Sequence, residues 1–359
     1  MKLLGVAFAV AWLALPGASP AAGIEGPCKN HYILDCPDPP AVPKSSNTFR
    51  ITKVFSSPSG GTQLIQISEM DGADGQHRLG GVELVSTNRY GAVRRYTIPH
   101  DLPSDRTAHR SVLFSTYWGE DFEIPPGFVP TDGGTLELAG IDRWEFEALP
   151  QDGLGALSRY GSPATDRTKP SIFLSFGNTP YMAYVVQDVI VEFHHAASDR
   201  YFVTMLGAEI DALDSGRVPG WARTGEWFLA EINGYFDPWE MYEPPPAGLQ
   251  PVCRLYLPPP EGPEHFYSAS KDECDLALRN IPGMVLETSQ AFLAALPDPA
   301  TGECPAKSLP LYRLWHRDAL GVSHRFLHWK STRDAMVADG WVSEGWGPDG
   351  VAMCTDTWR

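Results

Sequence analysis

The fold of this chain is decided by a stretch near its C-terminus that contains, in order, Leu311-Tyr312-Arg313-Leu314-Trp315, Ser323-His324-Arg325-Phe326, Arg333-Asp334-Ala335-Met336 and Gly340-Trp341. Two earlier segments follow the same order of aromatic strand, second strand, short helical run and glycine before a large apolar residue. Asp211, Asp275 and Asp334 mark the same position in the three copies. Self-similarity of this kind is the signature of a repeat architecture, in which each copy is one supersecondary unit.

Each copy is predicted to form two strands, one short helix and a third strand, in residues of about 186–232, 251–297 and 309–356. A Ser or Thr at the end of the second strand can cap the helix. Gly220, Gly283 and Gly340 can supply the left-handed residue at its C-terminal end. One unit cannot bury its aromatic face alone, so the three copies must share a core. We expect them to close with pseudo-threefold symmetry.

Residues 48–150 follow a different pattern, with short β-branched and apolar runs separated by Gly, Asp and Asn. Within one run, alternation puts Ile65 and Ile67 on one face and Leu64 on the other. Such runs, with turns at short spacing, are typical of an antiparallel β-sandwich. We expect a mostly β protein with short helices, in which residues 151–185 connect this sandwich to an α+β module in residues 186–359.

The first residues have the three parts of a secretory signal peptide. Lys2 supplies the cation, Leu3 to Leu15 form the apolar run, and small residues lead to a cleavage site after Ala22. A membrane anchor would instead need roughly 20 consecutive apolar residues. We therefore expect a signal peptide in residues 1–22, a Pro-rich leader in residues 23–47, and a secreted or periplasmic protein that does not insert into a membrane.

The composition excludes some partners. The formal net charge is −16, and phosphate-backbone binding needs clustered Lys and Arg, so no nucleic-acid partner is expected. An apolar content of 43% with 20% charged residues is typical of a globular protein. No nucleotide or cofactor motif occurs, and we expect a monomer without a cofactor.

The six cysteines are expected to form disulfides, because an exported chain meets an oxidising environment. The expected pairs are Cys28–Cys36, Cys253–Cys274 and Cys304–Cys354. The second would fasten the helix of the second copy to its first strand, and the third would close the last copy on itself. Pairing Cys253 with Cys354 is the alternative, since it would clamp the ends of a closed ring. A zinc site is not expected, because no C-x-x-C occurs and the spacings are too wide.

The third copy resembles a repeat module of unknown function at the C-termini of secreted bacterial proteins, whose hallmark is Tyr-Arg-x-Trp, a His-x-Phe/Tyr strand and Gly-Trp-x-x-Glu-Gly. The resemblance covers roughly residues 186–356. Tyr201 departs from it where the other copies have histidine, and Thr288 where they have glycine. These departures argue against one identical ligand site per copy.

A second resemblance, over Leu64–Leu136, is to the lamin-tail type of immunoglobulin-like sandwich in exported bacterial proteins. It rests on segments such as Leu79-Gly80-Gly81-Val82-Glu83-Leu84 and Gly133-Gly134-Thr135-Leu136. Neither resemblance implies a catalytic residue.

The candidate ligand-binding residues are Tyr201, His265, His324, Trp315 and Trp329. His265 and His324 are equivalent positions that could meet at a threefold axis; the alternative is that each ring bonds to a backbone carbonyl and packs on the neighbouring phenylalanine. Sugar-binding modules use exposed aromatic platforms, and the repeats are rich in tryptophan. The alternative is core packing, expected for Trp221 and Trp341 after the helix-ending glycines.

Catalytic and metal motifs are weak. Asp71-Gly72-Ala73-Asp74-Gly75 lacks the alternating ligands of a calcium loop, and a hairpin turn explains it better. The common hydrolase and nucleotide signatures are absent. Glu69, with Asp71 and Glu83 nearby, could supply the two carboxylates of a glycosidase. The alternative is that these residues are solvated, as acidic residues on exposed sandwich strands usually are.

The function expected from these observations is noncatalytic binding of an extracellular ligand, such as a cell-wall or surface glycan, by the repeat module. Two alternatives stay open. One is a hydrolase with acidic residues in the N-terminal sandwich. The other is a protein-interaction or assembly module without a small ligand.

Overall fold

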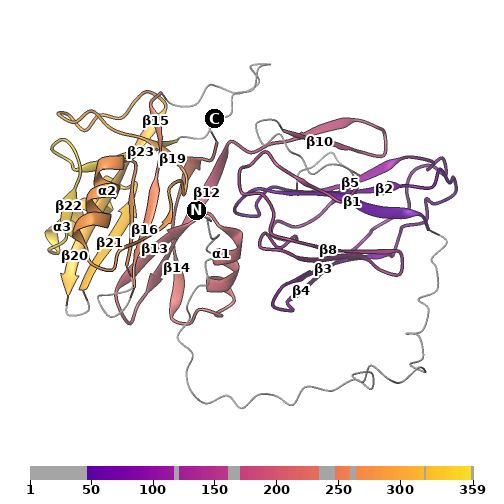
Figure 1. The fold of residues 1–359 in the computed structure, drawn as a ribbon, viewed down its shortest axis with the longest axis horizontal. Coiled ribbons are helices and arrows are strands. Elements are labelled where there is room, and N and C mark those ends of the chain that lie inside the picture. Colours follow the sequence, from indigo (N-terminus) through magenta and orange to yellow (C-terminus); the bar gives the residue numbers. More distant parts are fainter. Residues whose placement is uncertain are drawn as a thin grey trace, which may run out of the picture. The chain divides into compact units, whose positions relative to one another are not determined.

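The computed structural model describes residues 47–116, 121–160, 170–233, 247–258, 264–318 and 321–356. The predicted signal peptide and the predicted Cys28–Cys36 bond lie outside these residues. Strands dominate the described chain, and its three helices are short, so the mostly β class is confirmed (Figure 1). In this part of the chain, no helix is long and apolar enough to cross a membrane.

The N-terminal strands form two sheets. The first has the order β6-β5-β2-β1-β9, made of Phe122–Glu123, Ser111–Ser115, Gln63–Glu69, Phe49–Ser56 and Leu157–Ser158. The second has the order β4-β3-β7-β8, made of Val93–Thr97, Glu83–Asn88, Gly134–Leu138 and Asp142–Phe146. Apolar side chains of both sheets meet in one core that includes Phe49, Ile67, Leu84 and Leu136.

Strand β2 has the expected alternation. Ile65 and Ile67 are fully buried in this core. Leu64 lies on the opposite face, where it packs in a second cluster with Phe55, Leu113 and Phe173. Gln66 on that face is also buried, and its Oε1 accepts a hydrogen bond of 2.8 Å from the Leu174 amide. The outer face of β2 is therefore covered and not solvated.

That cover comes from residues expected to be a plain connection. Residues 151–185 contain β9, which pairs with β1, and a hairpin of β10 (Ser171–Leu174) and β11 (Pro180–Ala183). Phe173 of β10 reaches the second cluster. Their strands are so short, and their flanks so rich in turn residues, that the sequence shows no period of two there.

The three C-terminal segments each have the predicted order of strand, strand, helix and strand. The first has β12 (Gln187–His195), β13 (Arg200–Thr204), α1 (Gly207–Asp214) and β14 (Trp221–Glu231). The second has β16 (Cys253–Leu257), β17 (Glu264–Ser268), α2 (Lys271–Asn280) and β18 (Val285–Thr288). The third has β20 (Ser308–Asp318), β21 (Gly321–Leu327), α3 (Lys330–Ala338) and β22 (Val342–Glu344). In each copy the first strand pairs with both others.

Three more strands link the copies: β15 (Leu249–Pro251), β19 (Leu293–Ala295) and β23 (Val351–Asp356). Copies one and three share a sheet in the order β13-β12-β14-β19-β23-β20-β21, and copy two forms its own sheet, β17-β16-β18. The second strands β13, β17 and β21 contact one another pairwise. Arg200, Glu264 and Ser323 occupy equivalent positions on them and are all buried. Pseudo-threefold closure stays a prediction, and these contacts favour it.

The helix ends differ in part from expectation. The cap of α2 is Ser270, whose side chain accepts from the Glu273 amide, rather than Ser268 at the end of β17. Gly340 has a φ of 98° and directly follows the last capping residue of α3, as predicted. In the first copy that place is taken by Gly216, with a φ of 71°, because α1 ends earlier than expected.

Two of the predicted disulfides are present. Cys253 and Cys274 are bonded with their Cα atoms 6.4 Å apart, and Cys304 and Cys354 with theirs 5.7 Å apart. The alternative pairing of Cys253 with Cys354 is thereby excluded. The first bond ties α2 to β16, and the second ties the segment before β20 to β23.

Shortening Ile67 to alanine tests the N-terminal core. Because Ile67 is fully buried, Ile67→Ala is expected to lower the free energy of unfolding by about 2–5 kcal/mol, measured by urea titration. Met70→Ala, at a side chain 43% exposed, is the matched control and should change it by less than about 0.5 kcal/mol. If both substitutions lowered the free energy of unfolding equally, the burial of Ile67 in this core would be contradicted.

Candidate functional site at the junctions between the copies

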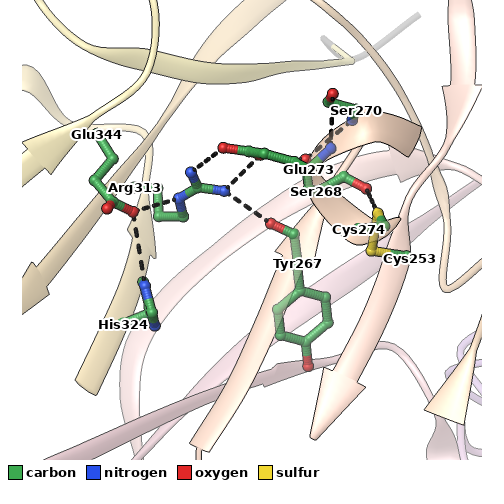
Figure 2. Close-up of polar contacts among 9 residues, drawn as sticks. All are labelled: Cys253, Tyr267, Ser268, Ser270, Glu273, Cys274, Arg313, His324 and Glu344. Carbon is green, nitrogen blue, oxygen red and sulfur yellow. Dashed lines mark hydrogen bonds and ion pairs between the residues drawn. A yellow bond between two sulfur atoms is a disulfide. The ribbon is translucent and has the colours of Figure 1, made fainter. Parts of the chain in front are cut away.

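A buried arginine, Arg313, holds the second and third copies together (Figure 2). It lies on β20 and is 4% exposed. Its terminal nitrogens donate to both carboxylate oxygens of Glu273 on α2, over 2.7 and 3.1 Å, and its Nε donates to Glu344 on β22 over 3.0 Å. A planar guanidinium matches a carboxylate in this two-bond geometry. We call this contact the second junction.

Three contacts around the start of α2 aim Glu273 at Arg313. The Ser268 hydroxyl donates to the Glu273 carboxylate over 2.5 Å. The Ser270 side chain accepts from the Glu273 amide over 3.3 Å. The next residue, Cys274, is bonded to Cys253 on β16. Figure 2 shows these groups converging on the start of α2. The disulfide therefore supports the helix turn that carries the carboxylate.

His324 on β21 extends the second junction toward the centre of the module. Its Nε2 lies 3.6 Å from the Glu344 carboxylate, and its Nδ1 lies 2.7 Å from the buried Glu264. Glu264 also accepts from the His324 amide over 2.7 Å and lies 3.9 Å from Arg200. Charged groups of all three copies are thus connected through Glu264.

Burial and ion pairing shift the pKa values of these groups in opposite directions. Burial alone would lower the pKa of His324, but its hydrogen bonds to Glu264 and Glu344 outweigh burial and raise that pKa above 6.5. Burial raises the pKa of Glu264 despite the same bonds. For Glu273 and Glu344, burial would raise the pKa, and bonds from Arg313 and His324 lower it instead.

The junction between the first and second copies repeats this arrangement. Arg254 on β16 donates to both oxygens of Glu209 on α1, over 2.8 and 3.0 Å, and lies 2.8 Å from Glu287 on β18. His265 lies 3.3 Å from Glu287, and Thr204 bonds to Glu209 as Ser268 does to Glu273. This first junction and the second share an Arg, a helix Glu, a strand Glu, a His and a hydroxyl at equivalent positions.

The third junction, between copies three and one, departs at all five of those positions. Glu192 replaces the arginine, Thr332 the helix glutamate and Thr224 the strand glutamate. Tyr201 replaces the histidine, and Leu327 replaces the hydroxyl residue. An ion pair persists with its polarity reversed, because Arg325 on β21 donates to both oxygens of Glu192 on β12, over 3.0 and 3.1 Å. The Arg325 guanidinium also lies 4.5 Å from the centre of the Tyr201 ring.

A bulge beside the third junction opens a cleft. Val191 of β12 pairs with Trp227 of β14, and Phe193 pairs with Arg223. Between these two pairs β14 advances by four residues while β12 advances by two. Gly225 within the bulge has a φ of 91°. The cleft has a volume of about 290 Å³ and is lined by Val189, Val191, Glu192, Arg223, Gly225, Glu226 and Trp227. The Trp227 side chain is 48% exposed there. We call this the Trp227 cleft.

The predicted ligand-binding residues have different surroundings. Tyr201, His265 and His324 lie in the junctions, and the two histidine rings contact carboxylates rather than the backbone carbonyls considered in the alternative. Trp315 is partly buried on β20, beside His324 of β21. Trp329 is 62% exposed, immediately before α3. Neither Trp315 nor Trp329 lines the Trp227 cleft.

Sequence reasoning missed the arginines and their carboxylate partners. The motif contained the signal, since Arg254 and Arg313 lie in apolar strands and Glu287 and Glu344 lie near the ends of the matching strands of the same copies. A charged residue within a buried strand requires a partner. The Trp227 cleft had no such signal, because a bulge shows no distinct residue pattern.

Glu69, the centre of the hydrolase alternative, is 2% exposed. Its carboxylate accepts from the Thr48 hydroxyl over 2.6 Å and from the amides of Asp71, Gly72 and His109 over 2.8–2.9 Å. Burial would raise the pKa of Glu69, but these bonds lower it to about 2. Glu69 therefore orders the loop after β2 and holds no proton to donate. Within the described residues, no cluster of His, Cys, Asp and Glu could hold a metal ion.

Comparison with known families gives one match. Residues 233–350 match a family model described as a domain of unknown function (DUF5648). The matched region contains the second copy and most of the third, and it is consistent with a C-terminal module of unknown function. No curated protein and no solved structure matches the chain.

Removing the arginine of the second junction is expected to be costly. Arg313→Met leaves Glu273 and Glu344 without their cation, which should lower the free energy of unfolding by about 3–5 kcal/mol. The control is Arg95→Met, which breaks an exposed pair with Glu83 and should cost less than about 1 kcal/mol. Urea titration of both variants is the measurement; a similar loss in both would show that the junction contributes no more than a surface pair.

The second junction also predicts a dependence on pH. Because the folded pKa of His324 is above 6.5, its contribution to stability is fully present below pH 6.5 and is lost as pH rises through the folded pKa. Glu264 acts in the same direction, since its folded pKa is raised too. We expect the free energy of unfolding to fall as the pH rises from about 6.5 through the folded pKa of His324. The double variant His324→Gln/Glu264→Gln should lose this slope, and an equal slope in both proteins would refute the assignment.

Proposed function

We propose that this chain is a noncatalytic extracellular protein whose three-copy module binds carbohydrate in the Trp227 cleft. The observation that carries the proposal is the half-exposed indole of Trp227 in the wall of a cleft. Ligand sites are concave and largely apolar, with a few polar groups that fix orientation. The lining of the Trp227 cleft, with one indole, two valines and three charged side chains, has that composition.

The two regular junctions support this location indirectly. Their arginines and carboxylates bond to one another, so these groups are occupied in holding the copies together. The third junction has lost that set, and the Trp227 cleft lies beside it. A ligand site where the copies differ is consistent with the departures at Tyr201 and Thr288, which argue against one identical site per copy.

The two disulfides support the extracellular part of the proposal. The Cys253–Cys274 and Cys304–Cys354 bonds form and persist in oxidising compartments. The signal-like N-terminus agrees with them. A secreted or periplasmic protein meets cell-wall and surface glycans, which are the carbohydrates we propose as ligands.

Protein binding is the second candidate function. Leu276, Ile281, Val285 and Leu286 are large apolar side chains within and after α2, and each is at least 39% exposed. Contiguous exposed apolar surface is typical of protein-interaction sites. The hydrolase alternative has no comparable support, because Glu69 is enclosed by hydrogen-bond donors.

Replacing the indole tests the carbohydrate proposal. Trp227→Ala should weaken binding to glycan arrays and to isolated peptidoglycan by about tenfold or more, since stacking contact is lost. Trp329→Ala is the matched control, because Trp329 is more exposed but lies outside the cleft, and its binding should be unchanged. Binding of neither glycan by the native protein, or an equal loss in both variants, would reject the site.

A further inference from the structure

The charges around the Trp227 cleft leave one carboxylate in excess. Arg223 lines the cleft, and its guanidinium bonds to both oxygens of Asp214 over 2.8–3.2 Å. Glu192 lines it too and is bonded to Arg325. Glu226 is the remaining charged group of the lining. Among the described residues, no hydrogen bond or salt bridge engages its carboxylate, and Arg325 influences it only through space.

Glu226 is specific to the first copy. The equivalent positions are Ser289 in the second copy and Trp346 in the third. In both of those copies the third strand ends before this position, whereas β14 continues through it. The acidic residue therefore occurs only in the copy whose bulge forms the cleft, directly before the exposed indole.

A cleft lined by both a carboxylate and an indole favours a cation. Tryptophan is the best aromatic partner for an ammonium group, through its ring quadrupole. An anionic ligand would meet the excess carboxylate and a chain with a formal net charge of −16. A neutral sugar could stack on Trp227 but would gain nothing from Glu226.

We propose that the Trp227 cleft selects sugars that carry a protonated amino group, with the sugar face on Trp227 and the ammonium group beside Glu226. This inference rests on the proposed carbohydrate binding and adds the ligand's charge. The chemical class is an unacetylated amino sugar, as found in deacetylated glucosamine polymers. Acidic sugars, such as uronic acids, are expected to be excluded.

The experiment compares three oligosaccharides of equal length by titration calorimetry: glucosamine, N-acetylglucosamine and galacturonic acid oligomers. The native chain should bind the glucosamine oligomer about tenfold more tightly than the acetylated one, and the acidic one not at all. Glu226→Gln should bring the two hexosamine affinities to within about twofold, with the acetylated one unchanged. Trp227→Ala should weaken both. An unchanged urea midpoint verifies that each variant is folded.

The outcomes separate this inference from the proposed function. Equal binding of glucosamine and N-acetylglucosamine oligomers by the native chain overturns the amino-sugar preference and leaves carbohydrate binding standing. A preference that survives Glu226→Gln overturns the role of Glu226. Binding of none of the three oligosaccharides contradicts the inference and the glycan proposal together.

Discussion

The C-terminal module depends on a buried guanidinium held between two carboxylates from different elements. Arg313 and Arg254 each bond to the helix Glu of the preceding copy and lie beside the strand Glu of their own copy. Removing such charges from water costs several kcal/mol, and mutual attraction repays that cost only in good geometry. A copy that slid or rotated against its neighbour would leave these charges buried without partners. The pairs therefore fix which surfaces of the copies meet, while the apolar residues supply most of the stabilisation.

Much of the framework could be predicted from the sequence, because it follows from local pattern. Alternation placed Ile65 and Ile67 on one face, and the spacing of aromatic strands, helical runs and glycines predicted the order of strand, strand, helix and strand in each of the three copies. Cys253–Cys274 and Cys304–Cys354 were preferred to Cys253–Cys354 because each bond joins parts of one copy, and both are present. Each of these inferences needs only neighbours along the chain or within one copy.

The missed features all require contacts between copies. The partner of Arg313 is forty residues earlier, on the helix of another copy, and the sequence alone does not show which of many acidic residues it meets. The two histidines were expected either at an axis or against backbone carbonyls; their actual partners are carboxylates that position them beside the arginines. Likewise, the cleft arises from a mismatch in length between β12 and β14, which is a property of the pairing and not of either strand.

The reversed ion pair of the third junction has a consequence for association between molecules. Modules built of similar units risk exchanging units between chains, because one unit resembles the next. Here a first copy from another molecule, placed on α2, would bring Glu192 against Glu273, two like charges at a buried contact. If Arg254 or Arg313 of another molecule were placed against the third copy, it would meet Thr332 in place of a carboxylate. Either mismatched contact between molecules would therefore place like charges together or leave an arginine buried without a carboxylate, and both are unfavourable.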